Sequence, residues 1–345
     1  MRNLKIVAVY HKSPHHAGYS GYGKFLAYIK NKVVIFSKAI LPYFLAKKIA
    51  KKIGENLGNY DTFSFYKDLQ VIVYIIKNWN SSIVVHYLNG ERDIRLAIGL
   101  FSNKKNVKFI ATFHKPPSIL EKTISNTKYL KKLDTAIVVG QNQKEFIKGW
   151  LHLEKVFYIP HGVDTTFFNP NYNLRPIDEK NILFVGQHLR DFEVFNKTVD
   201  LLLTSESNFT VTVILRKEYA FKINQHPRLT VLSGILDTSL CKHYQSAHLL
   251  FLPFIDVTAC NSLLEAMACG LPIVTTNIGG NIEYLRGTNN VLIEKGATIE
   301  TYKNSIVRLI YEDKNLFISK SSRNKSLEYK WELIAKQLEE CYINI

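Results

Sequence analysis

Cysteine is scarce in this 345-residue chain, long hydrophobic runs are absent from it, and acidic residues are fewer than basic ones. The four cysteines, Cys241, Cys260, Cys269 and Cys341, form no C-x-x-C pair, so the sequence favours reduced packing residues over a disulfide or zinc framework. No apolar run approaches the roughly 20 residues that a membrane-spanning helix needs. The first residues, MRNLKIVAVY, lead into a strand pattern without a signal-peptide cleavage site, so we expect a cytoplasmic protein.

The excess of positive charge points to an anionic partner. Lysine and arginine number 45 against 29 aspartates and glutamates, which gives a formal net charge of +16. Nucleic acid, an anionic membrane face and phosphorylated sugars all carry the complementary charge. Because the sequence has no helix-turn-helix, zinc-finger or RNP-like aromatic motif, charge alone is a poor argument for nucleic acid, and we expect none as a partner.

Short apolar runs alternate with helix-like segments along the whole chain. They are residues 5–9, 33–36, 83–87, 107–113, 135–139 and 156–159 in the first half, and residues 182–185, 209–215, 229–232, 249–254, 273–276 and 291–293 in the second. This alternation is typical of doubly wound parallel sheets. The polar stretch 171–180 between the halves has the composition of a linker, so we expect an α/β protein of two domains.

Residues 256–280, DVTACNSLLEAMACGLPIVTTNIGG, predict a turn, a short helix and a strand after the buried run 249–254. Asn261 and Ser262 offer N-cap chemistry for a helix over residues 262–269, which Gly270 and then Pro272 end. The N-terminus of that helix would face outward at the carboxyl edge of a parallel sheet. Its unpaired N–H groups and positive dipole end would favour a phosphate there.

The segment LLEAMACGLPIVTTNIGG within this stretch resembles the donor-binding motif of family 4 (group 1) glycosyltransferases. The resemblance implies the GT-B fold, in which two Rossmann-like doubly wound domains face a central cleft. In that family two glutamates eight positions apart hold the donor, the second at the nucleotide ribose and the first at the sugar. Glu265 matches the second, whereas Val257 stands at the first and Asp256 is the candidate replacement. The alternative is that Glu265 is an ordinary exposed helix residue.

The loop HKSPHHAGYSGYGKF after the first apolar run contains three glycines before a helix that we expect to start near Lys24. Its spacing is G-x-x-G-x-G and no acidic residue follows over positions 31–38, so it is not a dinucleotide fingerprint. The loop resembles the glycine-rich first loop that closes over the donor diphosphate in glycosyltransferases. The resemblance assigns Gly21, Tyr22 and Gly23 to that role.

Three further segments resemble ligand-contacting parts of the same family. Thr112-Phe113-His114-Lys115-Pro116-Pro117 resembles the strand end whose histidine reaches the donor sugar, although a lone histidine is more often structural. Gly186 begins the loop where the family has Gly-Arg and, five residues after the arginine, a lysine. Gln187 and Phe192 stand at those positions, and Arg190 and Arg216 are the available substitutes. Ser233-Gly234-Ile235 resembles the loop that borders the nucleotide base.

The resemblance therefore implies a retaining, metal-independent hexosyltransferase that moves a sugar from a nucleotide-diphosphate donor to a carbohydrate or lipid-linked glycan, as in polysaccharide biosynthesis. It needs no cofactor, and Asp191-Phe192-Glu193 is expected to be helix N-terminal charge and not a metal site. The expected catalytic residues are His114, Arg190 and Glu265, and the expected donor-binding residues are Gly21, Tyr22, Gly23, Gly186, Gln187, Arg190, Arg216, Gly234, Ile235, Thr258, Ala259, Cys260, Asn261, Ser262 and Glu265. A non-catalytic binding module and a nucleotide-sugar epimerase of the same fold are the alternatives.

The expected domains are residues 1–170 for the acceptor, residues 171–326 for the donor and a final helix, residues 327–345, that packs back on the first domain. Within the first of these domains we expect a helix that ends at Gly54. One half of its surface carries Leu45, Ala46, Ile49, Ala50 and Ile53, and the other half carries Lys47, Lys48, Lys51 and Lys52. This pattern fits an anionic membrane surface on the inner face of the plasma membrane, and it fits equally an ordinary domain helix with a solvated lysine face. The base, the sugar, the acceptor and the oligomeric state are not encoded in these motifs.

Overall fold

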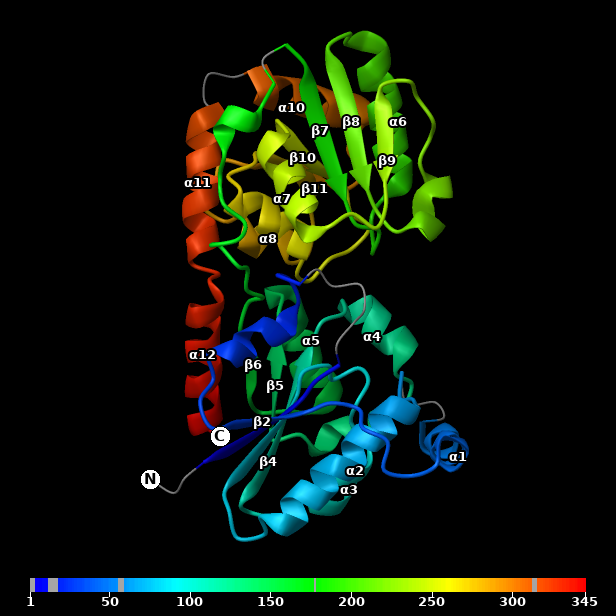
Figure 1. The fold of residues 1–345 in the computed structure, drawn as a ribbon, viewed down its shortest axis with the longest axis vertical. Coiled ribbons are helices and arrows are strands. Elements are labelled where there is room, and N and C mark those ends of the chain that lie inside the picture. Colours follow the sequence, from blue (N-terminus) through cyan, green and yellow to red (C-terminus); the bar gives the residue numbers. More distant parts are fainter. Residues whose placement is uncertain (1–3, 12–17, 55–58, 177, 312–314) are drawn as a thin grey trace. The chain divides into compact units, whose positions relative to one another are not determined.

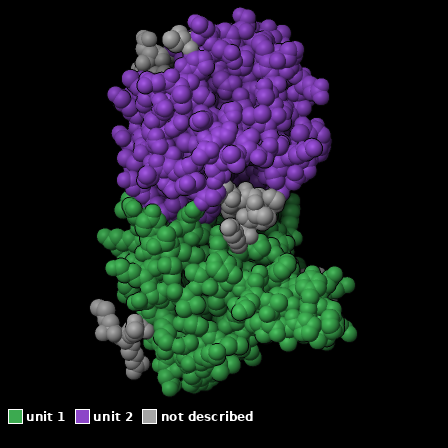
Figure 2. Space-filling view, viewed as in Figure 1, with its two compact units in different colours: residues 1–15, 22–160, 332–345 green, residues 16–21, 161–331 purple. Residues whose placement is uncertain are grey.

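The computed structural model describes residues 4–11, 18–54, 59–176, 178–311 and 315–345. Its contacts divide the chain into two compact units, which Figure 2 shows in different colours. Unit 1 contains Met1–His15, Tyr22–Pro160 and Glu332–Ile345, and unit 2 contains His16–Gly21 and His161–Trp331. The expected domain ranges 1–170, 171–326 and 327–345 stay predictions.

Unit 1 is built on a six-stranded sheet with the order β2-β1-β3-β4-β5-β6, in which every neighbouring pair is parallel. Its strands are β1 (Lys5–Val9), β2 (Lys32–Ile35), β3 (Ile83–Tyr87), β4 (Val107–Phe113), β5 (Thr135–Val138) and β6 (Val156–Tyr158). Its helices are η1 (Tyr22–Ala27), α1 (Tyr43–Gly54), α2 (Thr62–Lys77), α3 (Leu96–Phe101), α4 (Pro117–Thr123), η2 (Leu130–Lys132), η3 (Gln141–Gln143) and α5 (Lys144–Leu151). Figure 1 shows this sheet and its helices in blue to green.

Unit 2 repeats the plan with a second six-stranded parallel sheet, in the order β12-β11-β10-β7-β8-β9. Its strands are β7 (Lys180–Val185), β8 (Phe209–Ile214), β9 (Leu229–Leu232), β10 (Leu249–Leu252), β11 (Ile273–Asn277) and β12 (Val291–Glu294). Its helices are η4 (Tyr172–Leu174), α6 (Phe192–Ser205), η5 (Lys217–Lys222), α7 (Asp237–Ser246), α8 (Asn261–Ala268), α9 (Asn281–Tyr284), α10 (Ile299–Tyr311) and α11 (Asn315–Leu327). The prediction of two doubly wound α/β domains is confirmed.

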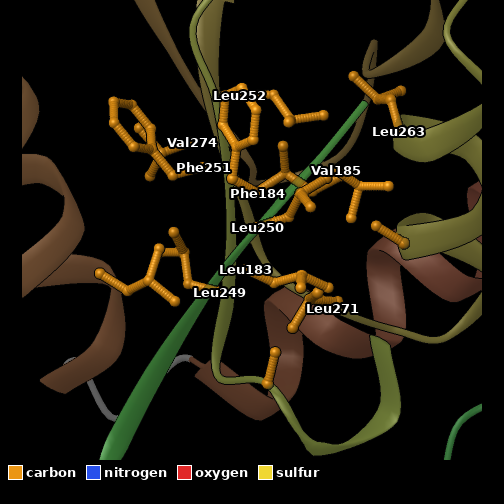
Figure 3. Packing of buried hydrophobic residues seen from close by; sticks show 14 of the residues in the cluster. Leu183, Phe184, Val185, Leu249, Leu250, Phe251, Leu252, Leu263, Leu271 and Val274 are labelled. Atoms are coloured by element: carbon orange, nitrogen blue, oxygen red, sulfur yellow. The ribbon is translucent and has the colours of Figure 1, made fainter. Parts of the chain in front are cut away.

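The central strands β10 and β7 are apolar where they are buried, because helices cover both of their faces. In β10 all four residues are buried, and so are the last four of β7. Figure 3 shows Leu249 to Leu252 of β10 packed with Leu183 and Phe184 of β7, and with Leu263 and Leu271 from the segment that follows β10. This core fixes the carboxyl ends of β7 and β10, from which the loops of the candidate site start.

Two expected helices differ from the observed ones. The glycine-rich loop leads into the short 3-10 helix η1, which begins at Tyr22, and not into an amphipathic α-helix from Lys24. The helix α8 begins at Asn261 after Cys260 in the N-cap position, and no side chain caps it. Asn261 and Ser262 therefore lie inside the first turn, and the prediction that they act as caps is wrong.

The last helix, α12 (Trp331–Ile343), carries residues that contact the sheet of unit 1. The hydroxyl group of Tyr342 lies 2.7 Å from Nδ1 of His86 in β3, and Nε2 of His86 lies 2.7 Å from the hydroxyl of Thr112 in β4. Burial lowers the pKa of His86 to about 3, so the ring is neutral and has one donor and one acceptor nitrogen for these two hydroxyl groups. Thr112 in turn donates to Tyr22 of η1 over 3.2 Å.

The helix α1 has a narrower buried face than its sequence suggests. Only its two small residues Ala46 and Ala50 are buried, whereas Leu45 and Ile49 are exposed. Within the described part of the chain, no helix combines the length and the apolar character that a membrane crossing requires.

Candidate functional site

The candidate site lies where three neighbouring strands of unit 2 end. β7 lies between β8 and β10 in the sheet, and Val185 at the end of β7 is in register with Ile214 at the end of β8. The N–H of Gly186 extends this pairing by donating to the carbonyl of Ile214 over 2.8 Å. Because parallel strands bring their carboxyl ends to one edge, the loops after β7, β8 and β10 start side by side there.

The first turn of α8 presents main-chain donors at this edge. Cys260 has an extended backbone with φ −129° and ψ 113°, and its side chain makes no capping hydrogen bond. The first N–H groups of an α-helix have no partner within the helix, and they carry the positive end of its dipole. The N-terminus of α8 is therefore suited to an anion.

Arg190 lies beside this helix end. Its Nη2 is 3.3 Å from Sγ of Cys260 and 3.4 Å from the hydroxyl of Ser262, and it donates to the carbonyl of Val185 over 2.8 Å. The guanidinium carbon lies 4.2 Å from the ring centroid of Phe254. None of the ion pairs between described residues includes Arg190, which is 6% exposed. A buried cation without a carboxylate partner next to a helix N-terminus reinforces the preference of this place for an anion.

Gly186 explains why the loop after β7 can approach so closely. Its φ of +86° is in the left-handed region, which favours glycine. A Cβ atom at this position would lie 3.0 Å from Nη2 of Arg190 and 3.5 Å from the hydroxyl of Ser262. The structure thus brings the predicted residues Gly186, Arg190, Cys260 and Ser262 together.

Glu265 is buried one turn further along α8, with 4% of its surface exposed. The hydroxyl of Tyr244 in α7 donates to its Oε2 over 2.9 Å, and the hydroxyl of Ser20 donates to its Oε1. Burial raises the pKa of Glu265, and the hydrogen bonds from Ser20 and Tyr244 oppose that shift. The interpretation of Glu265 as an ordinary exposed helix residue is wrong. Its carboxylate receives hydroxyl donors, which is the chemistry that binding a ribose diol requires.

The loop from Asp256 to Cys260 is closely packed on the glycine pair after β11. The N–H of Gly280 donates to the carbonyl of Val257 over 3.1 Å, and a Cβ atom on Gly280 would lie 1.5 Å from the carbonyl oxygen of Thr258. Val257 is buried in the core of unit 2, so the position of the family's sugar-binding glutamate is apolar and inaccessible. Asp256 is half-buried and accepts the N–H of Val257 at 2.8 Å, which uses one carboxylate oxygen within the loop.

The two positions where the family has cations have different surroundings. The amide oxygen of Gln187 accepts the N–H of Arg216 at 3.5 Å, so Arg216 lies close to the position of the missing arginine. Phe192, at the position of the lysine, packs on Phe184 with ring centroids 5.9 Å apart. Nζ of Lys222 lies 5.2 Å from the Phe192 ring centroid. The guanidinium of Arg216 pairs with Oε1 of Glu218 at 3.3 Å, and its role in place of Gln187 stays a prediction. Lys222 is a cation near Phe192 that the sequence pattern did not indicate.

The predicted site residues of unit 1 form a second group. The rings of Tyr22 and His114 meet edge to face with centroids 4.8 Å apart. Nε2 of His114 is 2.7 Å from the carbonyl oxygen of Leu88. The main-chain N–H of His114 donates to Oε1 of Glu91 over 2.5 Å. Gly23 is required by packing, because a Cβ atom there would lie 2.5 Å from the Tyr10 ring. The strand-end prediction for His114 is thus matched in position, and its ligand role stays a prediction.

Gly234, Ile235, Ala259 and Gly21 are further residues of the predicted set. Gly234 has a φ of +65° in the loop after β9, and Ile235 and Ala259 pack against the core of unit 2. Gly21 has a φ of +104°. Asp191 accepts the N–H of Val194 at 3.0 Å and caps α6, so it is charge at a helix N-terminus as the sequence predicted. Separately, the described residues contain no group of three or more potential metal ligands.

Sequence reasoning missed Tyr244, Ser20 and Gly280, which shape the site. Tyr244 lies on α7, and its partner Glu265 is 21 positions later, so no local pattern connects them. Ser20 lies within the glycine-rich loop, but a contact with Glu265 over 245 positions has no sequence signature. The pair Gly279-Gly280 stands at the end of the family motif. The packing on Thr258, which the sequence does not show, explains why position 280 is a glycine.

Two kinds of comparison relate the sequence to known proteins. Residues 179–312 match the family model described as "Glycosyl transferases group 1". The chain is 27% identical over 234 residues to a phosphatidylinositol N-acetylglucosaminyltransferase subunit from Arabidopsis thaliana, a match that covers 62% of this chain and 50% of the relative. It is 28% identical over 224 residues to a probable sucrose-phosphate synthase of Thermosipho melanesiensis, covering 56% of this chain and 47% of that protein. The chain thus spans about half the length of the curated relatives it matches.

Solved structures share the fold over nearly the full chain. Sucrose-phosphate synthase from Thermosynechococcus elongatus superposes with a TM-score of 0.70 at 15% identity, covering 99% of this chain and 98% of that one. A protein of Anabaena, Alr3699/HepE, solved in complex with UDP and glucose, superposes with a TM-score of 0.69 at 13% identity, covering 99% of this chain and all of the other. These likenesses establish the GT-B arrangement of two Rossmann-like domains as the fold class.

Proposed function

Because residues 179–312 match the family model of the group 1 glycosyl transferases, we propose that the chain transfers a sugar from a nucleotide-diphosphate sugar to a carbohydrate or lipid-linked glycan. The observation that carries the proposal is the arrangement along α8. The uncapped helix N-terminus and Arg190 suit a diphosphate, and Glu265 suits a ribose diol about one helical turn away. A nucleoside diphosphate carries both groups next to each other.

The chemistry follows from the charge that develops in this reaction. The bond between the anomeric carbon and the diphosphate oxygen breaks, an acceptor oxygen bonds to that carbon, and negative charge gathers on the departing diphosphate. Fixed cations and helix N–H groups that face this charge lower the barrier, so the transfer needs no metal ion and no cofactor. Arg190 and Arg216 are the cations that we assign to this role.

We assign the donor sugar contact to His114 and the diphosphate contact of the loop to the main chain of Gly21, Tyr22 and Gly23. Support comes from the place of His114 at the end of β4, where ligands of open α/β sheets bind. Retention of the anomeric configuration is proposed on the family relation. The departing phosphate is then the group that takes the acceptor proton, and no side chain is nominated as a general base.

Release of free nucleoside diphosphate tests the proposal. UDP-, GDP-, ADP- and dTDP-sugars are first screened by thermal shift, because a ligand that binds the folded state raises its apparent stability. The donor that binds is then incubated with glycan acceptors. We expect nucleoside diphosphate to accumulate only when an acceptor is present, and sugar interconversion without an acceptor would contradict a transferase.

A non-catalytic module that binds sugar nucleotides is the second candidate, and two apolar residues at family ligand positions favour it. Val257 leaves no carboxylate where the family contacts the sugar, and Phe192 replaces a cation with a ring packed on Phe184. These changes remove contacts with the sugar and with the departing diphosphate, and they leave the proposed ribose contact of Glu265 in place. Tight nucleotide binding without diphosphate release from any donor and acceptor pair would select the module.

We further propose that α1 binds an anionic membrane surface. Next to its exposed lysines 47, 48, 51 and 52 it exposes large apolar side chains that an ordinary domain helix would bury. They are Tyr43, Phe44, Leu45 and Ile49, with Ile40 and Leu41 just before the helix, and Phe44 is 69% exposed. Apolar side chains beside lysines are typical of helices that lie in the membrane interface.

Replacing lysines 47, 48, 51 and 52 with glutamine is expected to abolish sedimentation with phosphatidylserine vesicles at low salt. Each lysine near such a surface contributes about 1 kcal/mol, so four contribute about 4 kcal/mol and roughly a thousandfold in partitioning. The matched control replaces lysines 122, 128, 131 and 132, which are exposed elsewhere in unit 1, and changes the net charge equally. If both variants lose the same fraction of binding, the attraction is a property of overall charge and the assignment to α1 is wrong.

A further inference from the structure

Residues 18–21 of the glycine-rich loop are held on unit 2 by three contacts. The main-chain N–H of Gly18 donates to a carboxylate oxygen of Asp237 at the start of α7. The ring of Tyr19 stacks on Phe167, with centroids 3.6 Å apart and an angle of 5° between the planes. The hydroxyl of Ser20 donates to Oε1 of Glu265. These contacts make the segment part of unit 2, although the chain returns to unit 1 at Tyr22.

Ser20 occupies Oε1 of Glu265, which is the carboxylate oxygen that Tyr244 leaves available to a ligand. Oε2 already accepts the hydroxyl of Tyr244, which is fully buried between α7 and α8. Ser20 places a second hydroxyl on Oε1 of a carboxylate that is itself 4% exposed. An aliphatic hydroxyl that donates to this oxygen makes the same interaction as a ribose hydroxyl would.

We propose that residues 18–21 form an internal latch whose Ser20 hydroxyl occupies Glu265 in place of the nucleotide ribose, so that nucleotide binding must displace it. The inference rests on the proposed function, because it takes Glu265 as the ribose ligand. Tyr244 keeps its bond in both states and holds the carboxylate in place. The apparent affinity for nucleotide is then the intrinsic affinity reduced by the fraction of molecules in which the latch is open.

A chemical double-mutant cycle isolates this competition. Wild type and Ser20→Ala are titrated calorimetrically with UDP, GDP and ADP, and with the 2′,3′-dideoxy form of whichever nucleotide binds. We expect Ser20→Ala to bind the ribonucleotide about three- to tenfold more tightly, because its alanine cannot occupy Glu265. The dideoxy nucleotide does not engage Glu265, so its affinity is expected to be the same for both proteins.

A second variant checks the latch through a different anchor. Asp237→Ala removes the acceptor of the Gly18 N–H. Asp237 is not among the residues assigned to nucleotide binding, although its charge contributes, after burial, to the raised pKa of Glu265. This variant is expected to tighten ribonucleotide binding in the same direction as Ser20→Ala, with a wild-type melting temperature as evidence that the fold is intact.

The outcomes separate the two proposals. If Ser20→Ala leaves ribonucleotide affinity unchanged, weakens it, or changes both nucleotides equally, the latch is overturned while Glu265 remains a binding residue. If neither protein binds any nucleotide, the proposed function fails and the latch fails with it.

Discussion

Glu265→Ala is expected to weaken the binding of nucleoside diphosphate by about 1 to 3 kcal/mol, which is roughly a 5- to 150-fold rise in Kd. The carboxylate lies in a buried place, and the ribose hydroxyls that it would accept are left without a partner when it is removed. Tyr244 also loses its acceptor and is itself fully buried, so a lower melting temperature is expected as well. Isothermal titration calorimetry with the nucleotide found by thermal shift gives the affinity.

Two companion variants make this result specific. Glu265→Gln keeps an oxygen that can accept the Tyr244 hydroxyl, so its melting temperature is expected to stay near that of the wild type while its affinity falls. Glu193→Ala removes an exposed acid of α6 that pairs only with Lys197 at 2.7 Å in the ion pairs between described residues, and should change neither quantity. An alanine variant that binds nucleotide as tightly as the wild type would show that Glu265 is not the ribose ligand.

The pH dependence of binding gives an independent measure of the same carboxylate. Burial raises the pKa of Glu265 above the ordinary value of a glutamate, and the ionised form is the stronger acceptor because it has no O–H of its own and carries the charge. The affinity of the wild type is therefore expected to fall as the pH drops through this raised pKa, and to be constant well above it. Glu265→Gln cannot titrate, so the difference between the two pH profiles reports Glu265 and cancels the titration of the nucleotide itself.

The strands could be predicted because parallel strands buried on both faces are uninterrupted apolar runs. Residues 5–9, 83–87, 107–113 and 229–232 were predicted to the residue, and each of the other strands differs at one or both ends by one or two positions. The first residue of a helix depends on which group accepts hydrogen bonds from its first N–H groups. For α8 the sequence predicted the wrong residues for this role. Asn261 and Ser262 have the chemistry of caps, but the extended residue before α8 is Cys260, which leaves the helix end uncapped.

Within the site, the sequence could predict residues that act through their own type and position. Glu265 and Gly186 were found because a carboxylate and a glycine match the positions of the family motif, whereas Arg190 was named as an available substitute for the arginine that Gln187 replaces. The contacts that join them run across the fold, from Arg190 to Cys260 over 70 positions and from Tyr244 to Glu265 over 21. The order of the strands in the sheet decides which of these residues meet, and that order cannot be derived from a single sequence.

At position 257, where the family that the chain resembles has a glutamate, this chain has a valine that packing requires to be apolar. Val257 belongs to the core of unit 2, and its main-chain carbonyl accepts the N–H of Gly280. A glutamate at this position would have to take its charge into the core or turn the loop outward, and a buried charge without a partner is costly. The close approach of this loop to Gly280 therefore favours an apolar side chain at position 257.

Gly280→Ala is expected to destabilise unit 2 by about 3 kcal/mol and to abolish most of the nucleotide affinity. The new Cβ atom would lie 1.5 Å from the carbonyl oxygen and 2.7 Å from the carbonyl carbon of Thr258. Both are main-chain atoms, so no rotation of a side chain relieves the overlap and the loop that leads into α8 has to move. Overpacking of this kind costs about 1 to 3 kcal/mol and occasionally more. A fall of about 6 to 12 °C in the melting temperature follows for a unit of this size.

Gly149→Ala is the matched control for Gly280→Ala. Gly149 lies within α5, and a Cβ atom there meets nothing within 4 Å. Alanine is favoured over glycine in a helix interior by about 0.5 to 1 kcal/mol, so this variant is expected to be slightly more stable than the wild type. The two substitutions add the same methyl group, and opposite shifts in melting temperature would locate the cost in the contact with Thr258. A Gly280→Ala protein with wild-type stability and affinity would mean that the loop before α8 is not held by this contact.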